Sequence, residues 1–157
     1  MQPENKHNRI LCIVLWILTL LCMAAIFYFS SQPAVQSSGQ SSAVTLFLQR
    51  LFHTQAITNH IVRKTAHFIE FAGLGFLTSA SVLLTFGKRY LGVIIASLYA
   101  ATDEIHQIFV DGRSCQLTDW MLDTVGIITG ALIFSAVFCI IRRIIKHKKS
   151  NKGRYIK

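Results

Sequence analysis

The feature that most limits the fold of this chain is a run of twenty residues without a charged side chain, residues 10–29. A helix of that length rises about 30 Å, which matches the hydrocarbon thickness of a bilayer. Three further segments continue the pattern, residues 65–86, 91–110 and 121–141. Hydrophobic residues make up 52% of the chain, which is high for a soluble domain. We therefore predict an all-α fold, a four-transmembrane-helix bundle.

A cleaved signal peptide is the alternative interpretation of residues 10–29, because a short basic segment precedes them. The apolar run exceeds the usual signal-peptide core of about 7–15 residues, and no A-x-A cleavage site follows it. A retained membrane span is therefore the preferred interpretation.

Basic residues outside the predicted spans are distributed unevenly. Twelve of the sixteen lie before the first span, between the second and third, or after the fourth; the other side has only Arg50, Arg63, Lys64 and Arg113. Cytoplasmic loops are enriched in Lys and Arg, so we predict that both termini are cytoplasmic. The chain then divides into a cytoplasmic N-terminus (1–9), a transmembrane domain (10–141) and a basic cytoplasmic tail (142–157). The net charge of +9 reflects this topology, and we expect no nucleic-acid partner.

The first outer loop contains two predicted parts. Residues 30–42 are rich in Ser and Gln and include Pro33 and Gly39, so we expect an irregular linker there. After the linker, apolar residues recur at helical spacing, which predicts a short interfacial helix: Val44, Phe47, Leu48 and Leu51.

Two local signals predict how the second and fourth spans are built. Thr58 or Asn59 is a suitable N-cap for a helix that begins in water and enters the bilayer near Thr65. Gly126 and Gly130 form a G-x-x-x-G pair, which is typical of close contact between helices.

Acidic residues are concentrated in one part of the chain. Six of the seven fall between positions 70 and 123: Glu70, Asp103, Glu104, Asp111, Asp119 and Asp123. A charge near the centre of a transmembrane helix costs roughly 2.5–3.5 kcal/mol on insertion scales, so such acids tend to face a protein interior and mark function. At about 1.5 Å per residue, the polar residues of the last three spans lie within about 10 Å of the predicted outer ends. We predict one polar layer toward the outer leaflet.

Helical spacing also predicts which residues share a face. Lys64, His67 and Glu70 are three residues apart, and Asp103, Glu104 and Gln107 likewise fall on one side of the third span. Each of these two helices should therefore present a single polar face to a shared interior.

Three interpretations of the polar layer remain open. In the first it is structural: Lys64 or Arg63 pairs with Glu70, and Arg113 pairs with an acid of the third span, which fixes helix register. In the second it is a metal site, since His67 and Glu70 form an H-x-x-E pair; a divalent cation bridging a lipid phosphate is its most plausible form. Only one such pair occurs, so we expect no cofactor.

The third interpretation is chemistry on a lipid headgroup. Guanidinium and ammonium groups bind phosphate, and histidine and carboxyl groups transfer protons. We assign five residues as candidate catalytic groups: His67, Glu70, Asp103, Glu104 and Gln107. We assign five more as candidate substrate-binding groups: Arg63, Lys64, Arg113, Asp119 and Asp123. The surplus of titratable groups over what helix register requires favours this interpretation.

The order and spacing of these residues resemble the VanZ-like family. The matching motifs are residues 63–71 with Gly73 and Gly75, residues 103–109 leading to residues 112–114, then Asp119, Asp123, Gly126 and Gly130, with Ser-Ser-Gln-Pro at 30–33. Asp111 departs from the pattern, because a proline before Gly-Arg is common in the family.

The resemblance implies a small multi-pass protein of a bacterial cell membrane whose domain spans residues 10–141. The family is named for a determinant associated with low-level teicoplanin resistance. For the wider superfamily, it implies action on lipid headgroups, including lipid-linked cell-wall intermediates.

Three functions follow from these observations. The first is an enzyme that transfers or hydrolyses a phosphate-linked headgroup. The second is a non-catalytic protein that binds a lipid or a cell-wall precursor. The third is a small proton-coupled transporter, which is disfavoured because residues 75–86 and 91–99 carry no charge to continue a pathway.

Overall fold

Five helices account for nearly all of the chain in the computed structural model, which describes residues 6–154. The helices are α1 (Lys6–Ser30), α2 (Ala34–Phe52), α3 (Asn59–Phe86), α4 (Tyr90–Gln107) and α5 (Leu117–Arg154), and no strand occurs within the described residues. The all-α prediction is therefore confirmed.

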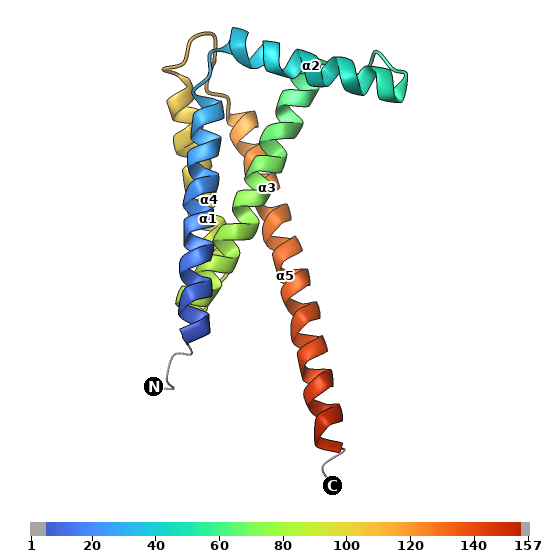
Figure 1. The fold of residues 1–157 in the computed structure, drawn as a ribbon. Coiled ribbons are helices and arrows are strands. Elements are labelled where there is room, and N and C mark those ends of the chain that lie inside the picture. The colour runs from blue at the N-terminus through green and yellow to red at the C-terminus, as the bar shows by residue number, and fades with distance from the viewer. Residues whose placement is uncertain (1–5, 155–157) are drawn as a thin grey trace.

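The helices form a bundle with one elaborated end (Figure 1). Helices α1, α3, α4 and α5 run along the bundle, while α2 lies across the end where α1 finishes and α3 begins. The connection between α4 and α5, residues 108–116, reaches the same end, where the backbone N–H of Ala34 donates to the carbonyl of Asp111 at 3.0 Å. We call this end, formed by α2 and residues 108–116, the loop end.

Three of the described helices are long and apolar enough to cross a membrane: α1 over Asn8–Ser30, α3 over Asn59–Phe86 and α5 over Leu117–Lys148. This is consistent with a multi-pass membrane protein. Helix α4 has only 18 residues, and its last turn and a half carries Asp103, Glu104, His106 and Gln107. The fourth span therefore stays a prediction, as do the orientation of the termini and the interfacial position of α2.

The structure corrects the expectation that residues 30–42 form an irregular linker. Helix α2 begins at Ala34, directly after Pro33, whose missing N–H is not needed there. Within the helix, the hydroxyls of Ser41, Ser42 and Thr45 donate to carbonyls four residues earlier. The polar composition is thus accommodated by local hydrogen bonds, and Gly39 is simply contained in the helix.

Other boundaries differ more modestly. Helix α4 ends at Gln107 rather than at 110. Helix α5 begins at Leu117 and continues to Arg154, so the first part of the predicted basic tail is helical. The predicted cap of α3 is confirmed, because the Thr58 hydroxyl accepts from the backbone N–H of Ile61 at 3.3 Å.

Close backbone contact between α3 and α5 organises the core. A Cβ atom at Gly130 would lie 1.8 Å from the Ala72 carbonyl oxygen, and one at Gly126 would lie 2.7 Å from that of Phe68. The predicted role of the glycine pair is therefore confirmed. Gly75 makes the reciprocal contact from α3, against the backbone of Ile127. The fully buried side chains lie around this crossing, among them Phe71, Leu74 and Ile127.

Two glycines of α3 provide a matched test of this contact. We expect Gly75→Ala to lower the free energy of unfolding by about 1–3 kcal/mol, because its Cβ would lie 2.2 Å from the Ile127 carbonyl oxygen. Gly73→Ala should leave that free energy unchanged or raise it by up to about 1 kcal/mol, since nothing lies within 4 Å and alanine favours the helix. Unfolding by sodium dodecyl sulfate in mixed micelles measures both, and equal effects would contradict the proposed contact.

Candidate functional site

A polar cavity opens at the loop end of the bundle. Its walls come from α3, α4, residues 108–116 and the first turns of α5, and it is lined by Arg63, Lys64, His67, Glu104, Gln107, Gly112, Arg113, Ser114, Gln116, Asp119, Leu122 and Asp123. Eight of the ten candidate site residues are thus brought to one cavity, although they come from positions 63 to 123. The exceptions are Glu70 and Asp103.

The predicted polar face of α4 is present and is buried. Asp103, Glu104 and Gln107 are 2%, 3% and 7% exposed, whereas Ile105 on the opposite side is 55% exposed. This arrangement follows from helical spacing, because residues three and four apart lie on one side of a helix.

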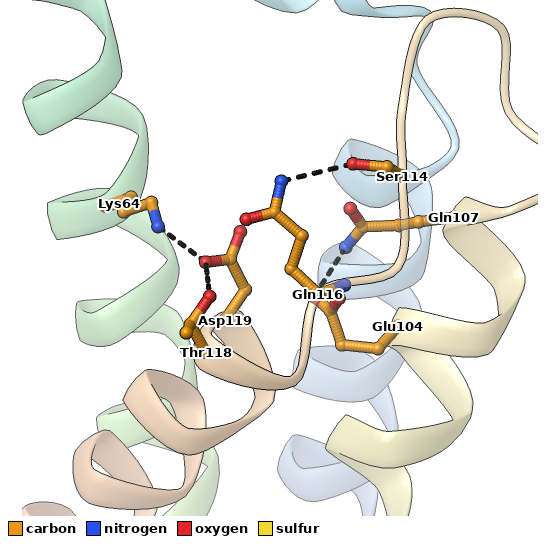
Figure 2. Close-up of polar contacts among 7 residues, drawn as sticks. All are labelled: Lys64, Glu104, Gln107, Ser114, Gln116, Thr118 and Asp119. Carbon is orange, nitrogen blue, oxygen red and sulfur yellow. Dashed lines mark hydrogen bonds and ion pairs between the residues drawn. The ribbon is translucent and has the colours of Figure 1, made fainter.

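Hydrogen bonds join the two acids of α4 to neighbouring segments. Oδ2 of Asp103 accepts from the Ser30 hydroxyl at 2.9 Å and from Nε2 of Gln107 at 3.3 Å. Glu104 accepts from Nε2 of Gln107 at 3.2 Å and from the backbone N–H of Gln116 at 3.1 Å (Figure 2). Together these bonds connect α4 to the end of α1 and to the connection of residues 108–116, so both acids have a structural role in the bundle.

The cations of the cavity have partners other than the expected acids. Nζ of Lys64 forms an ion pair with Asp119 at 2.5 Å, which joins α3 to α5 (Figure 2). Nε of Arg113 donates to the Gln32 carbonyl at 2.9 Å, and its Nη2 donates to the Phe29 carbonyl at 3.3 Å. The structural interpretation had Lys64 or Arg63 pair with Glu70 and Arg113 pair with an acid of α4. Among the described residues none of these ion pairs forms, so that pairing is wrong. Arg113 is instead bound to backbone carbonyls in the last turn of α1 and directly after it.

Arg113 is held rigidly and keeps its charge. Burial lowers the pKa of its guanidinium, and the nearby charge of Arg63 lowers it further. The guanidinium remains protonated nonetheless, because an arginine is not deprotonated in proteins. Since two donors are bound to carbonyls, the remaining donors of the fork are fixed in direction.

Asp123 is less satisfied by the protein than the acids of α4, of which Asp103 lacks a hydrogen-bond partner at Oδ1 alone among the described residues. The side chain is 1% exposed, and neither carboxyl oxygen has a hydrogen-bond partner among the described residues. A buried polar group without a partner destabilises a protein by about 1–3 kcal/mol. Because Asp123 lines the cavity, this unpaired carboxyl is a candidate for contact with a bound ligand.

Glu70 lies at a second cavity, on the side of α3 that faces α2. This α2 cavity is lined by Phe29, Ser37, Ser41, Val44, Val62, Arg63, Ala66, His67, Glu70 and Arg113. It shares Arg63, His67 and Arg113 with the polar cavity. The His67 ring stacks on Phe71 at 6.3 Å between centroids and has no hydrogen-bond partner among the described residues. His67 is therefore the unengaged base that both cavities share.

Several residues at the site were not assigned from the sequence. Ser30 binds Asp103, Gln116 binds Glu104 and lines the cavity, and Gln32 holds Arg113 through its carbonyl. The Ser-Ser-Gln-Pro motif at 30–33 was the available signal for Ser30 and Gln32. His106, in contrast, lies outside both cavities, with its ring against Phe27 and its Nε2 3.1 Å from Ser31 Oγ.

The structure adds no further metal ligands to His67 and Glu70 among the described residues. Among the described residues, no group of three or more His, Cys, Asp or Glu side chains lies close enough together to hold a metal ion. The H-x-x-E pair of His67 and Glu70 remains the motif on which that interpretation depends.

Two carboxyl groups of one cavity should respond oppositely to the same chemical change. Glu104→Gln should lower the free energy of unfolding by about 1–3 kcal/mol, because one carboxyl oxygen becomes an amide nitrogen, which cannot accept, so one of the two donors, Gln107 Nε2 or the Gln116 N–H, loses its partner. Asp123→Asn should raise it by about 1 kcal/mol, because it replaces an unpaired buried carboxyl. Detergent-unfolding titrations measure both, and a loss of stability in Asp123→Asn would show that this carboxyl has a partner in the protein.

Comparison with known proteins agrees with the motifs and the helical architecture. No curated protein and no solved structure matches the chain at a significant level. A search against protein families matches residues 15–141, which cover α1 through most of the apolar part of α5, to VanZ/LLP1. This protein therefore belongs to the VanZ/LLP1 family.

Proposed function

We propose that this protein acts on the phosphate-bearing headgroup of a membrane lipid, held in the polar cavity. The observation that supports this most directly is the composition of that cavity. Fixed cations and an unpaired buried carboxyl line one space at the end of an apolar helix bundle. A lipid headgroup carries the phosphate that the cations would bind. It also lies at the membrane surface, where the end of a membrane-spanning bundle would be.

The cations have a distinct role in this proposal. Arg63 and Arg113 line both cavities and would bind phosphate oxygens, a task suited to the planar guanidinium fork. Lys64 is already engaged with Asp119, so its contribution to phosphate binding would require exchange of that partner.

Proton transfer would fall to the groups that the protein leaves unengaged. His67 lies at both cavities, Glu70 at one and Asp123 at the other. A histidine close to a carboxyl group and to bound phosphate can remove a proton from an attacking hydroxyl and return it to a leaving group. Asp103 and Glu104, which are held by hydrogen bonds, would position Gln107 and Gln116 at the wall of the site.

The finer parts of the proposal concern the substrate and its location. We propose that the loop end faces the outer leaflet of a bacterial cell membrane, with both termini cytoplasmic. Lipid-linked cell-wall intermediates would then be accessible to the cavity. Modification of such lipids would alter the targets of glycopeptides and would contribute to teicoplanin resistance.

A non-catalytic lipid-binding or precursor-binding protein is the second candidate function. The observation that favours it is the engagement of Asp103 and Glu104, two of the predicted catalytic acids, in hydrogen bonds that join α4 to α1 and to the connection of residues 108–116. If those acids are structural, the remaining arginines suffice for binding without chemistry.

Substitutions at the unengaged groups test catalysis. We expect His67→Asn, Glu70→Gln and Asp123→Asn each to reduce lipid turnover by about 100-fold or more, the usual contribution of a general acid or base. Turnover is measured by mass spectrometry of lipids from proteoliposomes made with the total lipid extract of the expression host. Asp111→Asn is the matched control, because its side chain lies in the same loop region but lines neither cavity.

Unaltered turnover in all three variants would refute the proposed catalysis, provided that the wild-type protein turns lipid over. A selective loss in one variant would identify which cavity holds the reacting group, since Glu70 and Asp123 lie at different cavities.

Binding measured beside turnover separates the two candidate functions. For an enzyme, Arg113→Gln should weaken lipid binding by about tenfold or more, whereas Glu70→Gln should retain binding and lose turnover. For a binding protein, the wild type should form no product even with saturating lipid. Native mass spectrometry of detergent-purified protein measures bound lipid in each case.

A further inference from the structure

A largely apolar groove lies beside the polar cavity, between α3 and α5. It is lined by His60, Ile61, Lys64, Thr65, Phe68 and Leu122. Two of these residues, Lys64 and Leu122, also line the polar cavity. The groove and the cavity are therefore adjacent spaces with a common wall.

The crossing of α3 and α5 explains why the groove exists. The two helices touch through backbone where Gly126 meets Phe68 and Gly130 meets Ala72. From this crossing they separate toward the loop end (Figure 1), and the groove occupies the space between them there. Phe68, whose backbone meets Gly126 at the crossing, is the residue of α3 that lines the groove nearest to the crossing.

We propose that this groove holds the hydrocarbon chain of the lipid whose headgroup occupies the polar cavity, and that the lipid enters sideways between α3 and α5. The inference rests on the proposed function, because it requires a headgroup in the polar cavity. It adds the path by which the lipid enters and a binding site for its hydrocarbon chain, neither of which the headgroup site specifies.

Position supports a hydrocarbon chain as the occupant. Helices α3 and α5 are both long and apolar enough to cross a membrane, so the groove between them opens toward lipid. From His60 to Phe68 it extends about 12 Å along α3, so it passes the point near Thr65 where the sequence predicts that the helix enters the bilayer. Ile61, which lines it, is 50% exposed and has room for a chain against it.

Lys64 lies at the boundary between the apolar groove and the polar cavity, where the chain and the headgroup of a bound lipid would meet. Its apolar stem lies along the groove, and its ammonium reaches Asp119 of α5 at the side of the polar cavity (Figure 2). The two side chains of this ion pair are 30% and 27% exposed. Such partly exposed ion pairs contribute little net stability. Separating Lys64 from Asp119 to admit a lipid would therefore cost little free energy.

The α2 cavity is the competing route for a chain, and it is less suitable. Ser37, Ser41, Arg63 and Glu70 line it, so a hydrocarbon chain there would desolvate charged and hydroxyl groups. The groove between α3 and α5 has fewer such groups.

Bulky substitutions in the groove test the proposal. We expect Thr65→Trp and Ile61→Trp each to reduce lipid bound by the purified protein by about tenfold, because a filled groove removes at least two buried methylene groups of the chain. The probe is the total polar lipid extract of the expression host, and native mass spectrometry measures occupancy. Ile69→Trp is the matched control, since Ile69 is 62% exposed on the same helix and lines neither the groove nor the cavities.

The outcomes separate this inference from the function on which it depends. If Arg113→Gln loses lipid while both groove variants bind as the wild type does, the headgroup site stands and the groove is refuted. If Arg113→Gln binds normally, the headgroup site itself fails. Thermal unfolding of the variants must match that of Ile69→Trp, so that the loss of lipid reports the groove and not the fold.

A chain-labelled lipid locates the occupant independently. A phosphatidylglycerol with a photoreactive diazirine near the glycerol should label residues 60–68, and Thr65→Trp should remove that label. Labelling of residues 37–44 instead would assign the chain to the α2 cavity and overturn the proposal. Dimers that dissociate in Thr65→Trp would show that a second copy of the chain covers the groove, which would also overturn it.

Discussion

Backbone contact between α3 and α5 is the constraint on which the rest of this structure depends. Glycines at 75, 126 and 130 let the two helices meet without intervening side chains. Without a hydrophobic driving force between helices in lipid, such close packing is a main source of association. The contact fixes a crossing point, and the divergence of the helices from that point creates space at the loop end. Both the polar cavity and the groove beside it are consequences of this geometry.

The loop end is completed by hydrogen bonds that join distant segments. Asp103 binds Ser30 of α1, Glu104 binds the backbone of Gln116, and Arg113 binds carbonyls at the end of α1. These bonds use most of the polar groups that an isolated α4 would expose to lipid. They leave His67, both carboxyl oxygens of Asp123 and Oδ1 of Asp103 without a hydrogen-bond partner among the described residues. The acids that are held through at least one oxygen have a structural role, and Asp123, which is held through neither, is the stronger functional candidate.

Much of the site was predictable because it depends on local geometry. Helical spacing placed Asp103, Glu104 and Gln107 on one face, and the glycine pair predicted a close crossing. The partners of Lys64 and Arg113 were not predictable, because they come from segments far away in the sequence. The extent of α2 was also mispredicted. Serines disfavour helices on average, but here their hydroxyls bond to the preceding turn.

The sequence by itself determined an all-helical membrane protein of the VanZ/LLP1 family, with a polar layer in an otherwise apolar chain. Those properties depend on composition, periodicity and motif spacing, which are local. Only the tertiary structure decided which acids are hydrogen-bonded, which groups Lys64 and Arg113 bind, and where the polar cavity meets the groove. The physical reason is that a hydrogen bond or a cavity requires groups from several helices, and their positions follow from packing rather than from distance along the chain.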